Sequence, residues 1–257
     1  MDVANEVSHN FWKKFRQVCD EAKDDFYILG EIWHSSQRWL QGDEFHAVMN
    51  YAFTDAIIEY FVKGEISMTK MVSELNNQLM LYRDQTNQVQ FNILDSHDTP
   101  RLLTLARGDK DLMRQVMAFT YLQQGVPCLY YGDEIGLTGD MDPDCRKCMV
   151  WEEEKQDRDL LRFTTDLIHL RKSHQKILSE GSLNWNVISE EEGLIIFERE
   201  LGAQRIIGIF NTGEDQLTLS CPEEILLDQF MQIEDETMII DNKGFVIAKI
   251  NNEISNN

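Results

Sequence analysis

Residues 89–98, VQFNILDSHD, decide the fold. The stretch begins as an apolar run typical of a buried strand and ends in two ionisable side chains, His97 and Asp98. A helix-like stretch, KDLMRQVMAFTYLQQ, follows at residues 110–124. A buried strand followed by a helix is the unit from which parallel sheets are built, because parallel neighbours need a long crossover connection.

The same unit recurs through the first two-thirds of the chain. The other strand-like runs are FYILGEIW (26–33), HAVMNYAF (46–53) and GVPCLYYGDE (125–134), and the other helix-like stretches are 5–23, 53–64, 66–82 and 157–174. Strands that are apolar along their whole length are typical of a parallel sheet covered on both faces. The sequence therefore predicts an α/β fold.

Polar residues stand at or just past the predicted carboxyl ends of these strands. They are Asp2, Glu31, Asn50, His97, Asp98, Asp133 and Glu134. A (β/α) barrel keeps its catalytic groups at this end of its strands. Four strands and a stub around Asp2 are too few to close an eight-stranded barrel, so a partial barrel is predicted.

From about residue 176 the pattern changes to short alternating segments separated by Gly, Asn and acidic residues. These segments are GLIIFERE (193–200), QRIIGIFNTG (204–213), QLTLSCP (216–222) and GFVIAKI (244–250). We predict two domains, the partial barrel at 1–175 and a small antiparallel β domain at 176–257. The closing NNEISNN, residues 251–257, is expected to fray.

Charge and apolar content limit the partners of this chain. With 24 Lys and Arg against 45 Asp and Glu, the formal net charge of −21 disfavours binding to nucleic acid. The chain starts without the pattern of a signal peptide, and no apolar stretch approaches the length of a membrane span. A cytoplasmic protein with neither nucleic-acid nor membrane partners is expected.

The cysteines point to the same compartment. Five cysteines, an odd number, do not resemble a disulfide framework and fit a reducing environment. Cys145 and Cys148 form a single C-x-x-C with no second pair and no histidine at zinc-finger spacing. We therefore predict two free thiols and no metal site.

Asp2, Glu31 and Asp98 are the strongest chemical signal among the strand-end residues. Carboxylates gathered at one end of a sheet suit acid–base and nucleophilic work on a glycoside or phosphate ester. The alternative for each residue is helix capping, which the helix dipole favours for an acidic residue after a strand. Glu31 fits capping least, because IWH follows it and no helix begins there.

Four ordered motifs carry a family resemblance. DVANEVSH, GEIWH with WLQGDEFHAVMNYAF, FNILDSHDTPR, and GVPCLYYGDEIGLTGDMDPDCRKCMVW together resemble the α-amylase family, in its neopullulanase, cyclomaltodextrinase and maltogenic amylase branch. The resemblance covers nearly the whole chain. It implies the C-terminal half of such an enzyme: a (β/α)8 TIM barrel from a strand-four stub to strand eight, followed by an antiparallel β-sandwich.

The resemblance also implies roles for four residues. Asp2 matches the nucleophile, Glu31 the general acid–base, and Asp98 the carboxylate that binds sugar hydroxyls and stabilises the transition state. His97 would hydrogen-bond the same hydroxyls, with a structural histidine as the alternative. Together these roles describe double displacement with retention of configuration.

Four more residues match sugar-contacting positions of this branch. Trp33 and His34 would line the cleft beside the cleaved bond, although core packing explains Trp33 equally well. Asp142 and Arg146 resemble a sugar-contacting pair, with a structural ion pair as the alternative. The arginine that the family places two residues before the nucleophile has no counterpart here, which puts the orientation of Asp2 in doubt.

The implied function is hydrolysis of α-1,4-glucosidic bonds in maltooligosaccharides, cyclomaltodextrins or pullulan. The alternative is an inactive fragment, or half of a split enzyme that needs an N-terminal partner. A third reading pairs two copies into a homodimer along their open sheet edges. A dedicated carbohydrate-binding role for the β domain has less support. No cofactor is expected, and the calcium sites of this branch are expected largely in the missing half.

Overall fold

The computed structural model describes residues 1–251. The frayed tail expected at 251–257 lies outside this range, apart from Asn251, whose backbone continues the last strand. The helices are η1 (Ala4–Glu6), α1 (His9–Ala22), α2 (Tyr51–Ile57), η2 (Ile58–Lys63), α3 (Met68–Leu81), α4 (Asp84–Asn87), α5 (Leu102–Leu105), α6 (Lys110–Leu122), η3 (Asp133–Ile135), η4 (Asp144–Arg146), η5 (Glu153–Lys155), α7 (Arg158–Ser173) and α8 (Gln175–Glu180). The strands are β1 (Leu29–Gly30), β2 (Ala47–Val48), β3 (Phe91–Asn92), β4 (Val126–Pro127), β5 (Ser182–Ser189), β6 (Leu194–Leu201), β7 (Gln204–Asn211), β8 (Leu217–Ser220), β9 (Glu224–Glu234) and β10 (Thr237–Asn251).

The first part of the chain places four short strands and the start of the chain side by side. β1 pairs with β2 and β3 pairs with β4, both in parallel, and a parallel bridge from Met49 to Phe91 joins the two pairs. The start of the chain flanks β1: the Met1 amino group donates to the Leu29 carbonyl at 2.7 Å, and the Glu31 amide donates to the Met1 carbonyl at 2.9 Å. The predicted succession of parallel strands is confirmed, with much shorter ladders than the sequence runs suggested.

The helices between these segments begin at side-chain caps. Ser8, Ser67, Asp109 and Asp157 each accept a hydrogen bond from an amide in the first turn of α1, α3, α6 and α7. The helix expected at 53–64 is divided, because α2 continues as the π-helix η2 before Gly64 ends it with φ of 65°. None of the helices within residues 1–251 combines the length and apolar character needed to cross a membrane.

The C-terminal part is a single curled antiparallel sheet of six strands. Its order is β5-β6-β7-β10-β8, and β9 also pairs with β10. The first half of β10 pairs with β8 and β9, whereas its second half pairs with β7 and β9, with an irregularity between Ile240 and Phe245. The sequence analysis did not predict β5 or β9, because both are rich in polar residues.

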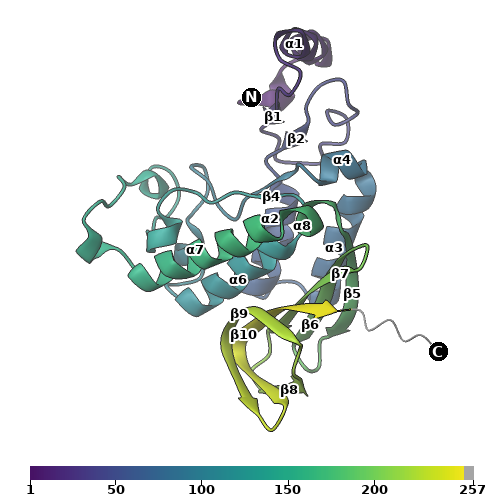
Figure 1. Ribbon diagram of the computed structural model, residues 1–257. Helices are drawn as coiled ribbons and strands as arrows, with labels where there is room; N and C mark the ends of the chain where they lie inside the picture. The colour runs from purple at the N-terminus through teal and green to yellow at the C-terminus, as the bar shows by residue number, and fades with distance from the viewer. Residues whose placement is uncertain (252–257) are drawn as a thin grey trace, which may run out of the picture.

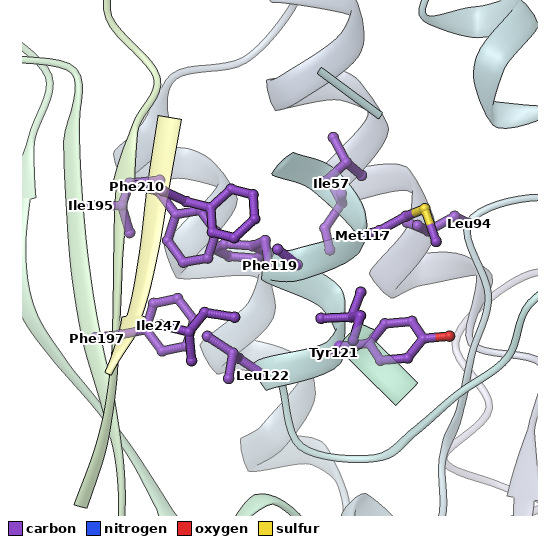
Figure 2. Packing of buried hydrophobic residues seen from close by; sticks show 14 of the residues in the cluster. Ile57, Leu94, Met117, Phe119, Tyr121, Leu122, Ile195, Phe197, Phe210 and Ile247 are labelled. Carbon is purple, nitrogen blue, oxygen red and sulfur yellow. The ribbon is translucent and has the colours of Figure 1, made fainter. Parts of the chain in front are cut away.

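Helix α6 lies between the parallel segments and the curled sheet (Figure 1). Phe119 on α6 lies 5.3 Å from Phe197 and 5.4 Å from Phe210, measured between ring centroids. Met117 and Tyr121 point away from the sheet, toward Leu94 (Figure 2). All of these residues belong to one buried cluster, so the sheet and the helices share a core, and the sheet also encloses a separate apolar cluster.

Two buried arginines secure the end of α6. Arg171 donates to the carbonyls of Tyr121, Gln123 and Gly125, and Arg199 donates to those of Leu122, Leu178, Gly181 and Ser182. Burial lowers the pKa of Arg171 to about 10 and that of Arg199 to about 9, so both stay charged at neutral pH. Cations at the carbonyl end of a helix complement its dipole, and Arg199 thereby ties the sheet to α6.

Candidate active site

Glu31, His97 and Asp98 form a cluster at the carboxyl ends of the parallel segments. One ligand atom from each of the three side chains lies within 4.8 Å of the others. Glu31 directly follows β1, and the other two lie in the loop after β3. Glu31 and Asp98 are half-buried and His97 is exposed. Parallel pairing thus brings distant parts of the sequence to one place.

Both carboxylate oxygens of Asp98 face a basic side chain. Nε2 of His97 lies 3.3 Å from Oδ2, and Nη2 of Arg146 donates to Oδ1 at 2.9 Å. Nε of Arg146 also lies 2.8 Å from Asp142 and donates to the His97 carbonyl at 3.0 Å. Asp142 and Arg146 therefore form the ion pair weighed above, and Arg146 extends it to Asp98.

Asp2 lies beside Glu31 along the backbone, but its side chain is not part of the cluster. The Val3 amide donates to Oε2 of Glu31 at 3.2 Å. Val3 has φ of 47°, a conformation that is unusual for a β-branched residue. The exposed Asp2 carboxylate has no hydrogen-bond or ion-pair partner within residues 1–251. The described part of the chain therefore gives this carboxylate no contact that orients it.

Trp33 forms an aromatic platform with Tyr51, which begins α2. The two rings are stacked, with centroids 3.7 Å apart and an interplanar angle of 10°. Trp33 is 47% exposed, so it is not a core residue. The Tyr51 hydroxyl lies 3.2 Å from Oγ of Ser96. Burial raises the pKa of Tyr51 to about 12, and the charges of Glu31 and Asp98 add to this effect.

His34 lies outside the cluster and is exposed. Its Nδ1 is 3.1 Å from the Ser35 carbonyl, and its ring centroid is 5.7 Å from that of the buried Trp39. The structure therefore brings Glu31, His97, Asp98, Asp142 and Arg146 together. It stacks Trp33 on Tyr51 and leaves the side chains of Asp2 and His34 outside the cluster.

Beneath the cluster lies a buried group of ionisable residues, Asp95, Arg101 and Asp133, of which the sequence analysis singled out only Asp133, as a strand-end residue. Arg101, fully buried, donates through Nη1 to Oδ1 of Asp133 at 3.0 Å. Oδ2 of Asp95 accepts from the Leu102 amide at 2.6 Å. Burial raises the pKa of both Asp95 and Asp133, and Asp95 raises that of Asp133 further. Arg101 ends the motif FNILDSHDTPR quoted above, but the motif alone did not predict that this arginine is buried.

The geometry argues against a metal at this site. Glu31, His97 and Asp98 are close enough to share a cation, but the guanidinium of Arg146 already neutralises Asp98. Cys145 is buried and Cys148 is exposed, and both are free thiols. Within residues 1–251 neither cysteine belongs to a group of potential metal ligands. The arrangement suits acid–base chemistry and binding of neutral hydroxyls.

Comparisons with known proteins identify the family of this chain. The family described as "Alpha amylase, catalytic domain" matches residues 3–181. The intracellular maltogenic amylase of Bacillus subtilis (strain 168) is 54% identical over 213 residues, which are 83% of this chain and 36% of that protein. The cyclomaltodextrinase of a Bacillus species is 46% identical over 221 residues, 86% of this chain and 39% of that protein.

Solved structures extend the likeness to the curled sheet. A cyclomaltodextrinase structure superposes with a TM-score of 0.84 at 41% identity, covering 96% of this chain and 44% of that chain. The chain thus spans less than half the length of these relatives. On its sequence and its fold, the chain belongs to the α-amylase family of glycoside hydrolases.

Proposed function

We propose that this chain carries the acid–base half of a retaining glycoside hydrolase acting on α-1,4-glucosidic bonds. The observation that supports it most is the cluster of Glu31, His97 and Asp98 at the ends of parallel segments in an α-amylase-type fold. Glu31 is suited to act as a general acid. The neighbouring Asp98, which contacts basic side chains, is suited to bind sugar hydroxyls.

In the proposed reaction a carboxylate oxygen of Asp2 attacks the anomeric carbon, while Glu31 donates a proton to the leaving glycosidic oxygen. Glu31 then takes a proton from water, whose oxygen replaces Asp2 at the anomeric carbon. Asp98, oriented by His97 and Arg146, would bind the neighbouring hydroxyls and stabilise positive charge on the sugar ring.

The proposed substrates are maltooligosaccharides, cyclomaltodextrins or pullulan. The similar proteins are named maltogenic amylase, cyclomaltodextrinase and neopullulanase. The open face of Trp33, supported by Tyr51, is suited to cover the apolar side of a glucose ring. Asp142, Arg146 and His34 are proposed to contact further sugar units. A cytoplasmic location is proposed along with these substrates.

A partial barrel at 1–175 and a β-sandwich unit at 176–257 are the proposed domains. The proposed partner is an N-terminal segment of α-amylase type that completes the barrel, with a second copy of this chain as the alternative. Exposed apolar residues near the first parallel segments, Val3, Phe26 and Tyr27, support this proposal. Such a segment would also give Asp2 neighbours that orient it.

The test is release of reducing sugar from a cyclomaltodextrin and from pullulan. The purified chain is assayed alone and with a separately made N-terminal half of the intracellular maltogenic amylase of Bacillus subtilis. Glu31→Gln is expected to lower turnover by about 100-fold or more, because amides cannot donate the catalytic proton. Glu192→Gln, at an exposed glutamate in the turn between β5 and β6, is the control.

An inactive fragment is the second candidate, and the unpartnered Asp2 carboxylate favours it. It predicts no turnover above that of Glu31→Gln in either arm of the assay. Turnover only after addition of the N-terminal half would instead identify a split enzyme. Turnover by the chain alone, lost in Glu31→Gln, would show that the described segments suffice.

A further inference from the structure

Arg101 connects three segments beneath the candidate active site. Its Nε donates to the Cys145 carbonyl at 3.0 Å, and its Nη1 donates to the Tyr131 carbonyl at 2.7 Å as well as to Asp133. The Arg101 amide donates to the Gly139 carbonyl at 2.9 Å. One fully buried residue thus joins the loop after Asp98, the end of the β4 segment and the 139–146 loop.

The 139–146 loop carries the groups that hold Asp98 in place. Sγ of Cys145 and Nε of Arg146 both donate to the His97 carbonyl, at 3.1 Å and 3.0 Å. Arg146 then reaches Oδ1 of Asp98. Since Arg101 binds the carbonyl of Cys145, the residue directly before Arg146, movement of Arg101 would displace Arg146 relative to Asp98.

The surroundings of Arg101 leave it little freedom. Its guanidinium carbon lies 4.4 Å from the ring centroid of Tyr130 and 4.8 Å from that of Tyr131. Its Nη1 also lies 3.0 Å from Oδ1 of the buried Asp133. A buried ionic group contributes little net stability compared with an apolar core of the same volume. A role in fixing the geometry of the loops therefore accounts for this arrangement better than a contribution to stability.

We propose that Arg101 is a positioning residue that holds the 139–146 loop against His97 and Asp98 and so fixes the contact between Arg146 and Asp98. Its effect on sugar binding rests on the proposed function. Its hold on the loop does not, and that hold is measurable in a protein without turnover.

The reactivity of the Cys145 thiol reports on the loop. Cys145 is fully buried, so alkylation by iodoacetamide requires the loop to open. In Arg101→Lys the charge is kept, but the hydrogen bond from Nε to the Cys145 carbonyl is lost. Alkylation of Cys145 is expected to become about tenfold faster or more. Loss of a hydrogen bond from a charged donor shifts the local opening equilibrium toward the open state by about that factor.

Arg199→Lys is the matched control. Arg199 is also fully buried and also donates to carbonyls, but at the end of α6. Trypsin cleaves after Arg146 and Lys147, so mass spectrometry resolves Cys145 from the exposed Cys148. The proposal is overturned if Cys145 in Arg101→Lys reacts as slowly as in the unaltered chain, or if Arg199→Lys accelerates it equally.

If Arg101→Lys does not fold, Asp133→Asn provides a second variant that weakens the ionic contact to Nη1 and keeps an acceptor. It is expected to accelerate alkylation of Cys145 by a smaller factor, and an unchanged rate overturns the proposal. In the assay for sugar release, Arg101→Lys is expected to lower kcat about tenfold, and Arg199→Lys is expected to leave kcat unchanged. Absence of turnover in both arms of the assay contradicts the proposed function, and the thiol measurement still decides the role of Arg101.

Discussion

Arg146 and Arg199 show how differently two regions of the molecule use a guanidinium group. Arg146 is 45% exposed and pairs with the carboxylates of Asp98 and Asp142 at the strand ends. Arg199 is fully buried and donates only to backbone carbonyls where the sheet meets α6. Exposed ion pairs contribute little stability, whereas a buried donor that satisfies several carbonyls is costly to remove. The first region leaves its charged groups accessible to solvent, whereas the second holds the fold together.

Phe119→Ala should have the largest effect on stability. Phe119 is fully buried at the centre of the shared core and lies close to Phe197 and Phe210. Removal of its ring should lower the free energy of unfolding by about 3–5 kcal/mol, from lost burial and the cavity left behind. Urea denaturation followed by circular dichroism measures this. A loss below about 1 kcal/mol would mean that the sheet and α6 do not share one core.

Asp98→Asn should spare the fold and reduce the proposed activity. The amide keeps an acceptor for Arg146 but loses the negative charge that we propose stabilises the transition state. Turnover should fall about 100-fold, while the urea midpoint stays close to that of the unaltered chain. Asp159→Asn, in the first turn of α7, is the control. An equal loss of turnover in both variants would remove Asp98 from the proposed mechanism.

Asp133→Asn should change how stability depends on pH. Because the pKa of Asp133 is well above 3.8 in the folded chain, the folded state binds its proton more tightly than the unfolded state. The associated stability is fully present below pH 3.8 and is lost as pH rises through the raised pKa. Asparagine cannot ionise, so the variant should gain stability relative to the unaltered chain as pH rises above 4. Parallel stability curves from pH 4 to 8 would contradict this.

Arg162→Ala should have the smallest effect. Arg162 and Asp159 pair within α7 with exposed fractions of 73% and 72%. Solvent screens such a pair and side-chain entropy opposes it, so no measurable change in melting temperature is expected. A clear loss of stability would mean that exposed pairs contribute more to this fold than the comparison of Arg146 with Arg199 suggests.

Much of the candidate active site around Arg146 could be predicted from local sequence, whereas the junction of the sheet and α6 around Arg199 could not. Glu31 and Asp98 stood out because carboxylates follow apolar runs that form parallel strands. Trp33 stacks on Tyr51 because β1 and β2 pair in the register that sets Gly30 opposite Val48. No local sequence pattern predicts that register. The strands β5 and β9 were missed because many of their residues are polar, although each pairs with the next strand along the chain, β6 and β10.

The sequence by itself determined the α/β succession, the change to antiparallel strands near residue 176 and the family to which the chain belongs. These depend on apolar periodicity and short motifs, which are local. Only the tertiary structure decided that Arg101 is buried beneath Asp98, that Arg199 binds the end of α6, and that Asp2 stays exposed. Burial and charge pairing depend on which distant segments meet, and this is fixed only when the chain has folded.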